Sequence, residues 1–191
     1  MAASERKTEL LDCAEGIIQR VGINAMSYQD LSDAIGIRKA SIHHHFAKKE
    51  DLILALQERC RVNYAQRYLV IAESAAPAAT KLMQLAEIFA NSAAEQKLCF
   101  VTMLSAEYAS LSPQSQAHLQ TTVEGTTAIV ETIIRQGIEV GDFSSVSDSQ
   151  ATAFAYISLL MGGHMLARSK GGCDSLIEAA RAFVDNLHLS V

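Results

Sequence analysis

The sequence predicts an all-α protein of about nine helices, and three observations support this fold class. First, only 6% of the 191 residues are aromatic, tryptophan is absent and proline occurs twice, whereas Ala, Leu, Ile, Gln and Glu are plentiful. Such a composition favours helices. Second, apolar residues recur at spacings of three and four over most of the chain, as on the buried face of an amphipathic helix. Third, serine, proline and glycine residues stand between these periodic segments, where helices begin and end.

Two short-range patterns predict the first two helices. The segment 5–21 repeats apolar residues at helical spacing, and Gly22 ends it. Ser27 and Asp30 then have the three-residue spacing of a capping box, in which each side chain accepts a hydrogen bond from the other residue's backbone. They predict the start of a second, short helix, which ends at Gly36.

A third short helix is expected to begin near Lys39, and a long fourth helix to run from Lys48 or Lys49 to about Ala72. Acidic residues in the first turn of the fourth helix, such as Glu50, suit the positive end of the helix dipole.

The remainder of the chain predicts five further helices. Ser112 and Pro113 form a strong start signal, because Ser is a preferred N-cap and Pro fits the first helical position. Gly141 ends that helix, and Ser147 with Gln150 is expected to cap the next one. The five expected helices are 80–94, 98–110, 113–140, 148–169 and a last one that Asp174 opens.

The charge is unevenly distributed along the chain. Sixteen Lys and Arg residues against twenty-one Asp and Glu residues give a net charge of −5, which by itself does not suggest nucleic-acid binding. The stretch 34–49, however, contains Arg38, Lys39, Lys48 and Lys49 and no acidic residue. Phosphate contacts require such local clustering, because the displaced counterions are those near the contacting groups.

The segment from Ser27 to Leu52 has the pattern of a helix-turn-helix motif. It contains two short helices separated by a tight Gly turn, and apolar residues such as Leu31 and Ile42 are placed to pack where the helices cross. The second helix would expose hydrogen-bond donors and no carboxylate, as a helix in the DNA major groove requires. These donors are Arg38, Lys39, Ser41, His43 and His44.

The residues that close this motif, IHHHF at 42–46 and AKKEDL at 47–52, resemble the DNA-binding region of the tetracycline-repressor (TetR) family. The resemblance covers about residues 5–55. It implies a cytoplasmic transcriptional regulator, most often a repressor, that binds a palindromic operator in double-stranded DNA as a homodimer. It also implies phosphate contacts from Lys49, from position 43 and from Ser27 or Tyr28, and base reading by Arg38, Lys39 and His44.

His43 departs from the family pattern, which usually has Tyr at this position. An imidazole has a shorter reach than a phenol, and its charge depends on pH near neutrality. We therefore expect DNA affinity to rise as the pH falls towards about 6.

In this family the region after the fourth helix usually forms the dimer and encloses an effector pocket, which implies domains at 1–50 and 51–191. Residues 98–113 also resemble the electrophile-sensing branch of the family, which includes the repressor of N-ethylmaleimide reductase and senses through a cysteine. Cys99 occupies that place beside Lys97 and an expected helix N-terminus, whose dipole would stabilise a thiolate. A buried structural cysteine is the alternative. The residues expected to sense or line the effector site are Phe89, Cys99, Phe100, Met103 and Tyr108.

The expected helices 148–169 and 174–188 are the candidate dimer interface. Small residues on the first of them would let a partner helix approach closely, and a two-fold interface would place the recognition helices about one DNA turn apart. Alternatively, both helices complete the core of a monomer. The expected interface residues are Ala151, Ala155, Ser158, Leu159, Gly162, Leu166, Ile177, Ala180, Phe183 and Leu187.

Other classes of function find little support in the sequence. It contains no Gly-rich phosphate loop and no pair of metal ligands at helical spacing, so we expect neither an enzyme nor a bound metal or cofactor. The consecutive histidines at 43–45 point about 100° apart on a helix and cannot converge on one ion. Widely spaced cysteines and the lack of a long apolar segment fit a reducing cytoplasm. A helical protein-binding module is the alternative to a regulator, and salt-dependent binding to a palindrome distinguishes the two.

Overall fold

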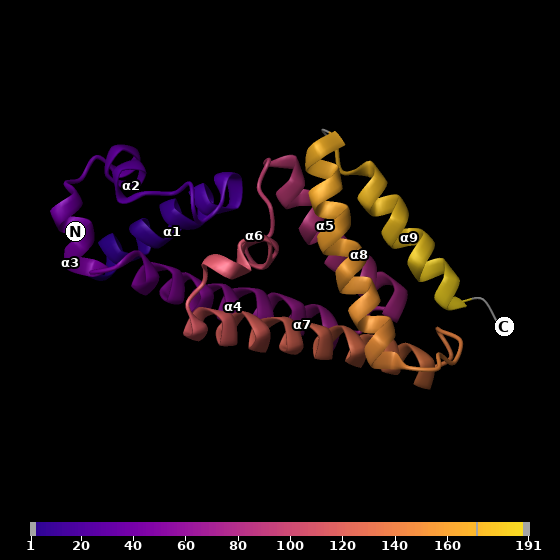
Figure 1. The fold of residues 1–191 in the computed structure, drawn as a ribbon. Coiled ribbons are helices and arrows are strands. Elements are labelled where there is room, and N and C mark those ends of the chain that lie inside the picture. The colour runs from indigo at the N-terminus through magenta and orange to yellow at the C-terminus, as the bar shows by residue number, and fades with distance from the viewer. Residues whose placement is uncertain (1–2, 171, 189–191) are drawn as a thin grey trace. The chain divides into compact units, whose positions relative to one another are not determined.

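The computed structural model describes residues 3–170 and 172–188, and this part of the chain folds into nine α-helices and one 3-10 turn without a strand (Figure 1). The predicted all-α class and the approximate number of helices are confirmed. Among these residues no helix combines the length and the apolarity that crossing a membrane requires.

The chain forms two compact units, and neither is continuous in sequence. The first unit comprises Met1–Val62 and Phe100–Thr122, and the second comprises Asn63–Cys99 and Val123–Val191. The expected boundary at residue 50 falls in the first turn of a long helix, α4 (Lys49–Glu73). This helix is uninterrupted and contributes residues to both units, so residue 50 marks no break in the structure.

In the first unit, α1 packs against α2 and α6, and α2 packs against α3. Its core is built from fully buried aliphatic side chains, among them Leu10, Ile18, Leu31 and Leu56. The elements of this unit are α1 (Ala3–Val21), α2 (Tyr28–Ile35), α3 (Lys39–His45), the start of α4, α6 (Phe100–Ala106), the 3-10 turn η1 (Tyr108–Ser110) and the start of α7 (Pro113–Glu139).

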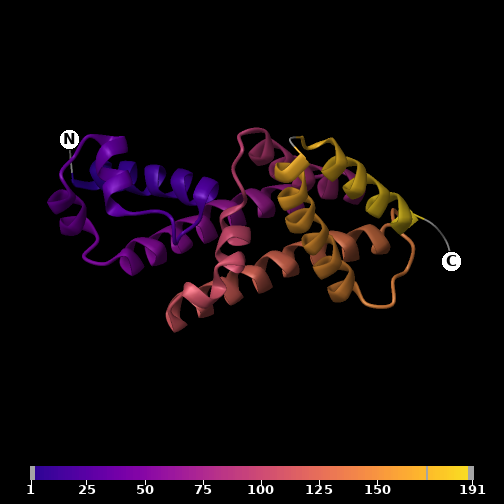
Figure 2. The same cartoon turned by 45° about the horizontal axis from the view of Figure 1, so that its top comes forward.

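The second unit contains α5 (Ala78–Ala94), α8 (Ser149–Lys170), α9 (Asp174–His188) and the remaining parts of α4 and α7. Helices α5, α8 and α9 pack against one another, and α8 and α9 lie side by side in both views (Figures 1 and 2). The fully buried Tyr156 of α8 donates a hydrogen bond from its hydroxyl to the Leu82 carbonyl of α5 over 2.7 Å. A buried polar group is therefore satisfied inside the core, as stability requires.

Lys81 and Gly137 lie where two elements of this unit come close together. The ammonium of Lys81, which is buried, donates a hydrogen bond to the Ala72 carbonyl over 2.8 Å and so satisfies a backbone acceptor in the last turn of α4. On α7, a Cβ added at Gly137 would lie only 2.4 Å from Phe143 Cδ2 and 2.7 Å from Ala78 Cβ. No larger residue fits there without a shift of these neighbours.

Most helix ends lie within two residues of the predicted ones, and two of the differences have a visible local cause. The expected helix 98–110 is α6 followed by the tighter turn η1, in which the Ser110 amide donates to the Glu107 carbonyl. Helix α8 begins at Ser149, one residue later than expected, because its N-cap is Asp148 rather than Ser147. The Asp148 carboxylate accepts a hydrogen bond from the Ala151 amide over 3.0 Å.

Candidate DNA-binding interface

Helix α3 presents one polar face and one anchored face. Ile42 is fully buried and Phe46, at the end of the helix, is 3% exposed, so both hold α3 against the first unit. Arg38, Lys39, His43 and His44 are exposed, and Ser41 is half-buried. The exposed side chains follow the helical repeat, so they share one face of a helix whose other face is fixed.

The start of α2 is fixed by the capping box that the sequence predicts. The Asp30 amide donates to the Ser27 hydroxyl, and the Ser27 amide donates to the Asp30 carboxylate over 2.7 Å. Gly36 ends the helix with a left-handed φ of 74°, which glycine adopts without strain. This pairing also lowers the pKa of Asp30, because the hydrogen bonds from Ser27 favour the charged carboxylate.

Tyr28 links α2 to the end of α3. Its hydroxyl donates a hydrogen bond to the Phe46 carbonyl over 2.9 Å, and its ring meets the His43 ring edge-on with 4.8 Å between the centroids. Burial, with a smaller contribution from the Asp51 charge, raises the pKa of Tyr28 to about 12. The structure therefore gives Ser27 and Tyr28 a positioning role within the motif, and their phosphate contacts stay predictions.

One of the two ring nitrogens of His43 forms a hydrogen bond within the protein. Its Nδ1 lies 3.2 Å from the Ala47 carbonyl oxygen, which can only accept a hydrogen bond, so Nδ1 carries the proton. A neutral His43 ring then has no proton on Nε2 and cannot donate to a phosphate. Protonation of the ring supplies both a second donor and a positive charge, which sharpens the expectation that binding at this position depends on pH.

The basic residues of the motif differ in how much they are engaged. The Lys49 ammonium donates to the Met26 carbonyl over 2.5 Å, and burial lowers the pKa of Lys49, although the Glu107 and Asp30 charges act in the opposite direction. Within the described part of the chain, Arg38 and Lys39 form no ion pair. Arg38 and Lys39, two of the three residues expected to read bases, are thus exposed. The expected phosphate contact Lys49 is instead held against the Met26 carbonyl, in the turn between α1 and α2.

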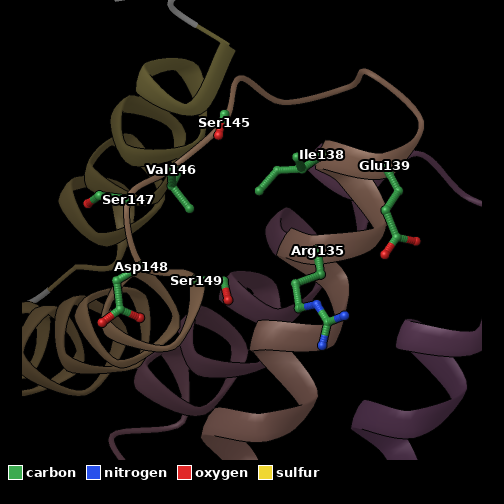
Figure 3. Close-up of a pocket in the computed structure, with 8 residues that line it drawn as sticks. All are labelled: Arg135, Ile138, Glu139, Ser145, Val146, Ser147, Asp148 and Ser149. Atoms are coloured by element: carbon green, nitrogen blue, oxygen red, sulfur yellow. The ribbon is translucent and has the colours of Figure 1, made fainter.

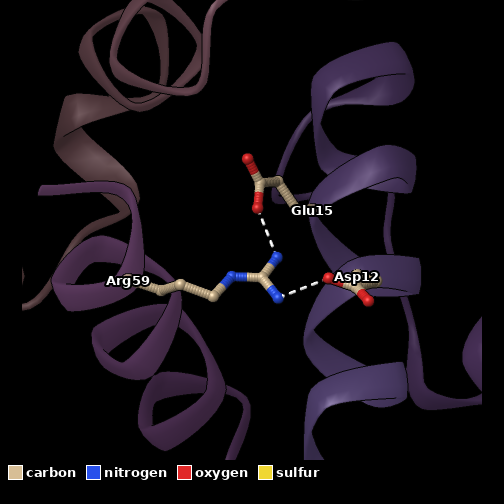
Figure 4. A network of polar contacts seen from close by, with 3 residues as sticks. All are labelled: Asp12, Glu15 and Arg59. Atoms are coloured by element: carbon tan, nitrogen blue, oxygen red, sulfur yellow. Dashed lines mark hydrogen bonds and ion pairs between the residues drawn. The ribbon is translucent and has the colours of Figure 1, made fainter. Parts of the chain in front are cut away.

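The structure adds two basic residues that sequence reasoning did not single out. Lys7 of α1 places its ammonium 5.6 Å from the centre of the Phe46 ring, beside the end of α3. Arg59 of α4 joins α1 through two carboxylates, those of Asp12 at 2.6 Å and of Glu15 (Figure 4). The helical periodicity of α1 is the one sequence signal that could have placed Lys7 on the side of α1 that faces α3. The sequence carries no signal for the Arg59 contacts, because the bonded residues are more than forty positions apart.

Comparison with protein families decides the class of this chain. Residues 10–56 match the family model described as bacterial regulatory proteins of the tetR family, and residues 78–183 match the tetracyclin repressor-like C-terminal domain. The chain belongs to the TetR family. The resemblance inferred from residues 42–52 is therefore confirmed, and the second match extends it over more than half of the chain.

Solved TetR-family structures share the fold over nearly the whole chain. A TetR regulator from Legionella pneumophila is 29% identical, covers 99% of this chain and 100% of its own, and has a TM-score of 0.86. A regulator from Agrobacterium tumefaciens is 23% identical, covers 97% and 99% of the two chains, and has a TM-score of 0.91. Reduced NemR from E. coli is 22% identical, covers 96% and 97%, and has a TM-score of 0.83, which is a likeness of fold.

Curated relatives match only a short stretch of this chain. The transcriptional repressor KstR2 of Rhodococcus jostii is 42% identical over 50 residues, which are 26% of this chain and 24% of KstR2. KstR2 of Mycobacterium tuberculosis is 36% identical over 50 residues, 26% of this chain and 25% of its own length. The matched region thus spans about a quarter of these curated relatives.

The structure brings two of the five expected effector-site residues together. Phe89 and Cys99 line a small cavity of about 10 Å³ in the second unit, and Phe100, Met103 and Tyr108 belong to the first unit. A space of this size holds at most about one water molecule, so a ligand there requires the lining to move. The other lining residues, which sequence reasoning did not identify, are Tyr64, Tyr68, Ile88 and Ser92.

A buried histidine holds the backbone around Cys99. His164 of α8 is fully buried, and its Nδ1 accepts a hydrogen bond from the Cys99 amide over 3.4 Å. Its Nε2 donates to the Lys97 carbonyl over 2.9 Å, so the ring is neutral with both nitrogens paired. Burial lowers the pKa of His164, and the Arg168 charge acts in the same direction against the hydrogen bond with Lys97.

The charges expected to activate Cys99 are weaker in the structure than the sequence suggested. The Lys97 ammonium pairs with the Glu95 carboxylate at 2.6 Å. The helix that follows Cys99, α6, has only seven residues, so its dipole is small. Sensing by Cys99 stays a prediction that rests on its half-buried position beside the cavity.

A larger, open cavity of about 440 Å³ lies at the end of α7, and no predicted site residue lines it (Figure 3). Its charged side chains do not converge on one point: Asp148 lies on one side, and Arg135 and Glu139 lie on the other. Two of its polar residues are already engaged, since Asp148 caps α8 and the Ser149 hydroxyl donates to Glu131. The lining residues are Arg135, Ile138, Glu139, Ser145, Val146, Ser147, Asp148 and Ser149.

The expected dimer residues divide into three groups by exposure. Ala180 and Leu187 are buried in the core of their own unit, so these two side chains do not belong to an exposed interface. Helical periodicity identified an apolar stripe on α9 correctly, but this part of the stripe faces α5 and α8. Leu159, Ile177 and Phe183 are half-buried, and the exposed residues are Ala151, Ala155, Ser158, Gly162 and Leu166, with Phe154 and Met165 as further exposed apolar residues that the sequence did not single out.

Proposed function

We propose that this chain is a transcriptional repressor that binds a palindromic operator in double-stranded DNA as a homodimer and is released by an effector sensed in its C-terminal region. The observation that carries the proposal is the exposed face of α3 and its N-cap: Arg38 and Lys39 are exposed there and form no ion pair with any residue that the structure describes. Ile42 and Phe46 anchor the helix. Donors of this kind read base edges and phosphates in the major groove. Bacterial DNA would place this activity in the cytoplasm.

The exposed face of α8 supports a homodimer. Phe154, Met165 and Leu166 are 56%, 44% and 66% exposed, and Ala155 and Gly162 leave room for a partner helix close to the backbone. Exposed apolar surface of this kind marks interaction sites, and a self-complementary contact generates a two-fold dimer. Two recognition helices related in this way would read a palindromic site.

Selection of DNA from a random library tests the regulator proposal. We expect the wild type to enrich a palindrome, Lys39→Ala to bind it more weakly, and Lys170→Ala, which changes an exposed lysine of the second unit, to bind like the wild type. The slope of log affinity against log salt should fall by about one for each phosphate contact removed. A folded wild-type dimer that enriches no sequence at low salt would show that the chain is instead a protein-interaction module.

For the effector, we propose a small or reactive molecule that engages the cavity beside Cys99. Conjugate addition of the Cys99 thiolate to N-ethylmaleimide forms one S–C bond, while the electron pair of the opened C=C bond takes up a proton. The bulky product does not fit a cavity of about 10 Å³. We expect the reagent to release DNA from the wild type and from Cys173→Ser but not from Cys99→Ser; equal release from all three proteins would exclude Cys99 as the sensor.

A further inference from the structure

The turn between α1 and α2 forms a small backbone cradle that is occupied by a carboxylate from a distant part of the sequence. Glu107, which follows α6, accepts hydrogen bonds at its Oε2 from the Ile23 amide over 2.5 Å and from the Asn24 amide over 3.2 Å. The Asn24 side chain adds a donor to the Ser110 hydroxyl over 2.9 Å. All four residues lie in the first unit, so the segment after α6 is tied directly to the turn that precedes α2.

Gly22 makes room for this carboxylate. Its φ is +93°, and a Cβ added there would lie 2.7 Å from Glu107 Oε1. Glycine is thus required twice, by the left-handed backbone and by the approach of the acid. Successive backbone amides that converge on one oxygen are a typical anion-binding arrangement, and here the anion is supplied by the protein itself.

The same turn is held from its other end by a cation. The Lys49 ammonium, at the start of α4, donates to the Met26 carbonyl, and the Glu107 charge is the larger of the two acidic influences on Lys49. Residues 22–26 are therefore fixed by a carboxylate on their amides and by an ammonium on a carbonyl. Ser27, which caps α2, follows immediately.

We propose that Glu107 is a positioning residue for DNA recognition: by filling the amide cradle of the α1–α2 turn, it sets the start of α2 and couples the α6 segment to the helix-turn-helix motif. The inference rests on the proposed DNA-binding function. Glu107 itself touches no DNA in this scheme, because it acts through the backbone of Ile23 and Asn24. A displacement of α6 would withdraw the carboxylate and leave two amides of the turn without their acceptor.

Two conservative substitutions separate positioning from charge. In Glu107→Gln the side-chain length is kept, and the amide oxygen can take the place of Oε2 and accept both hydrogen bonds. In Glu107→Asp the charge is kept, but the side chain is one methylene shorter and cannot fill the cradle. Positioning therefore predicts that the neutral variant behaves like the wild type and the charged variant does not. Glu87→Gln, an exposed residue of α5, is the matched control.

The measurement is affinity for the DNA site selected by the wild type, with hydrogen exchange at the Ile23 and Asn24 amides as the second readout. We expect Glu107→Asp to lose about tenfold in affinity, with faster exchange at these two amides and an unchanged salt slope, because no phosphate contact is removed. Glu107→Gln and the control should remain within about threefold of the wild type. The exchange readout distinguishes a local effect from global destabilisation, which would accelerate exchange throughout the unit.

Three outcomes would overturn the positioning role. Loss of affinity in Glu107→Gln with retention in Glu107→Asp would show that charge acts on Lys49, which overturns the positioning role. Wild-type affinity in both variants overturns it as well, as does faster exchange across the whole first unit. Failure of the wild type to bind any DNA sequence would instead overturn the proposed function on which the inference rests.

Discussion

Arg59 offers a measurable test of how burial sets the strength of an ion pair, because one guanidinium contacts two carboxylates of α1 that differ in exposure (Figure 4). The Asp12 side chain is 68% exposed and the Glu15 side chain is 18% exposed. Exposed ion pairs contribute about 0.2–1 kcal/mol, whereas hydrogen bonds to charged groups in less solvated places contribute about 1.5–3 kcal/mol. We therefore expect coupling to Arg59 of about 1.5 kcal/mol for Glu15 and about 0.3 kcal/mol for Asp12.

Double-mutant cycles in urea measure both couplings, with Arg59→Leu combined in turn with Glu15→Gln and Asp12→Asn. A cycle is needed because Arg59 also has a buried Nε without a hydrogen-bond partner in the described part of the chain. The single substitution therefore removes both the ion pairs and the free-energy cost of burying this unpaired donor. The Asp12 coupling should vanish in high salt while the Glu15 coupling persists. Equal couplings, or a larger one for Asp12, would refute the assignment of strength by burial.

Three further predictions follow from individual residues. DNA affinity of the wild type should rise between pH 8 and 6 while that of His43→Gln stays flat, which binding titrations can measure, and a flat wild-type profile would contradict the role of the protonated ring. Gly125→Ala on α7 should raise the free energy of unfolding by about 0.5–1 kcal/mol, because nothing lies within 4 Å of a Cβ added there. Gly137→Ala should lower it by about 1–3 kcal/mol, because the added Cβ would overlap Phe143 and Ala78. A stabilised Gly137→Ala would show that these neighbours shift at little cost. Burial lowers the pKa of His164 in the folded chain, so the unfolded chain binds more protons in acid. The free energy of unfolding should therefore fall as the pH drops below about 6.5, and it should fall less in His164→Gln. Parallel pH profiles of the wild type and the variant would exclude this linkage.

The helix-turn-helix motif could be predicted from the sequence because its determinants are local. The Ser27 and Asp30 capping box, the left-handed Gly36 and the buried Ile42 act within a few residues of one another. Such signals are readable without knowledge of the rest of the fold. The exposure of Lys39 followed from the same short-range periodicity.

Contacts between distant segments were not predictable, since spacing carries no information about them. The Ile23 amide and the Glu107 carboxylate are 84 residues apart, and the Cys99 amide and the His164 ring are 65 residues apart. Lys49 illustrates the same limit, because the sequence identified a basic side chain but not the Met26 carbonyl that it contacts.

Periodicity likewise identified buried faces without identifying what covers them. On α9, Ala180 and Leu187 have the spacing of an apolar stripe, and this spacing is the same whether the stripe meets α5 and α8 or a second subunit. On α8, the aromatic Phe154 is exposed, which the spacing of small residues along that helix does not predict.

The discontinuity of the first unit limits how this protein can be dissected or recombined. A fragment that stops at residue 56, the end of the N-terminal family match, lacks the segment Phe100–Thr122, with the buried Leu104 and the acid that occupies the α1–α2 turn. Truncation would therefore expose apolar core and strip the turn of its acceptor. A chimaera that gives this chain a new sensor should exchange only Asn63–Cys99 and Val123–Val191, so that the first unit keeps both of its sequence segments.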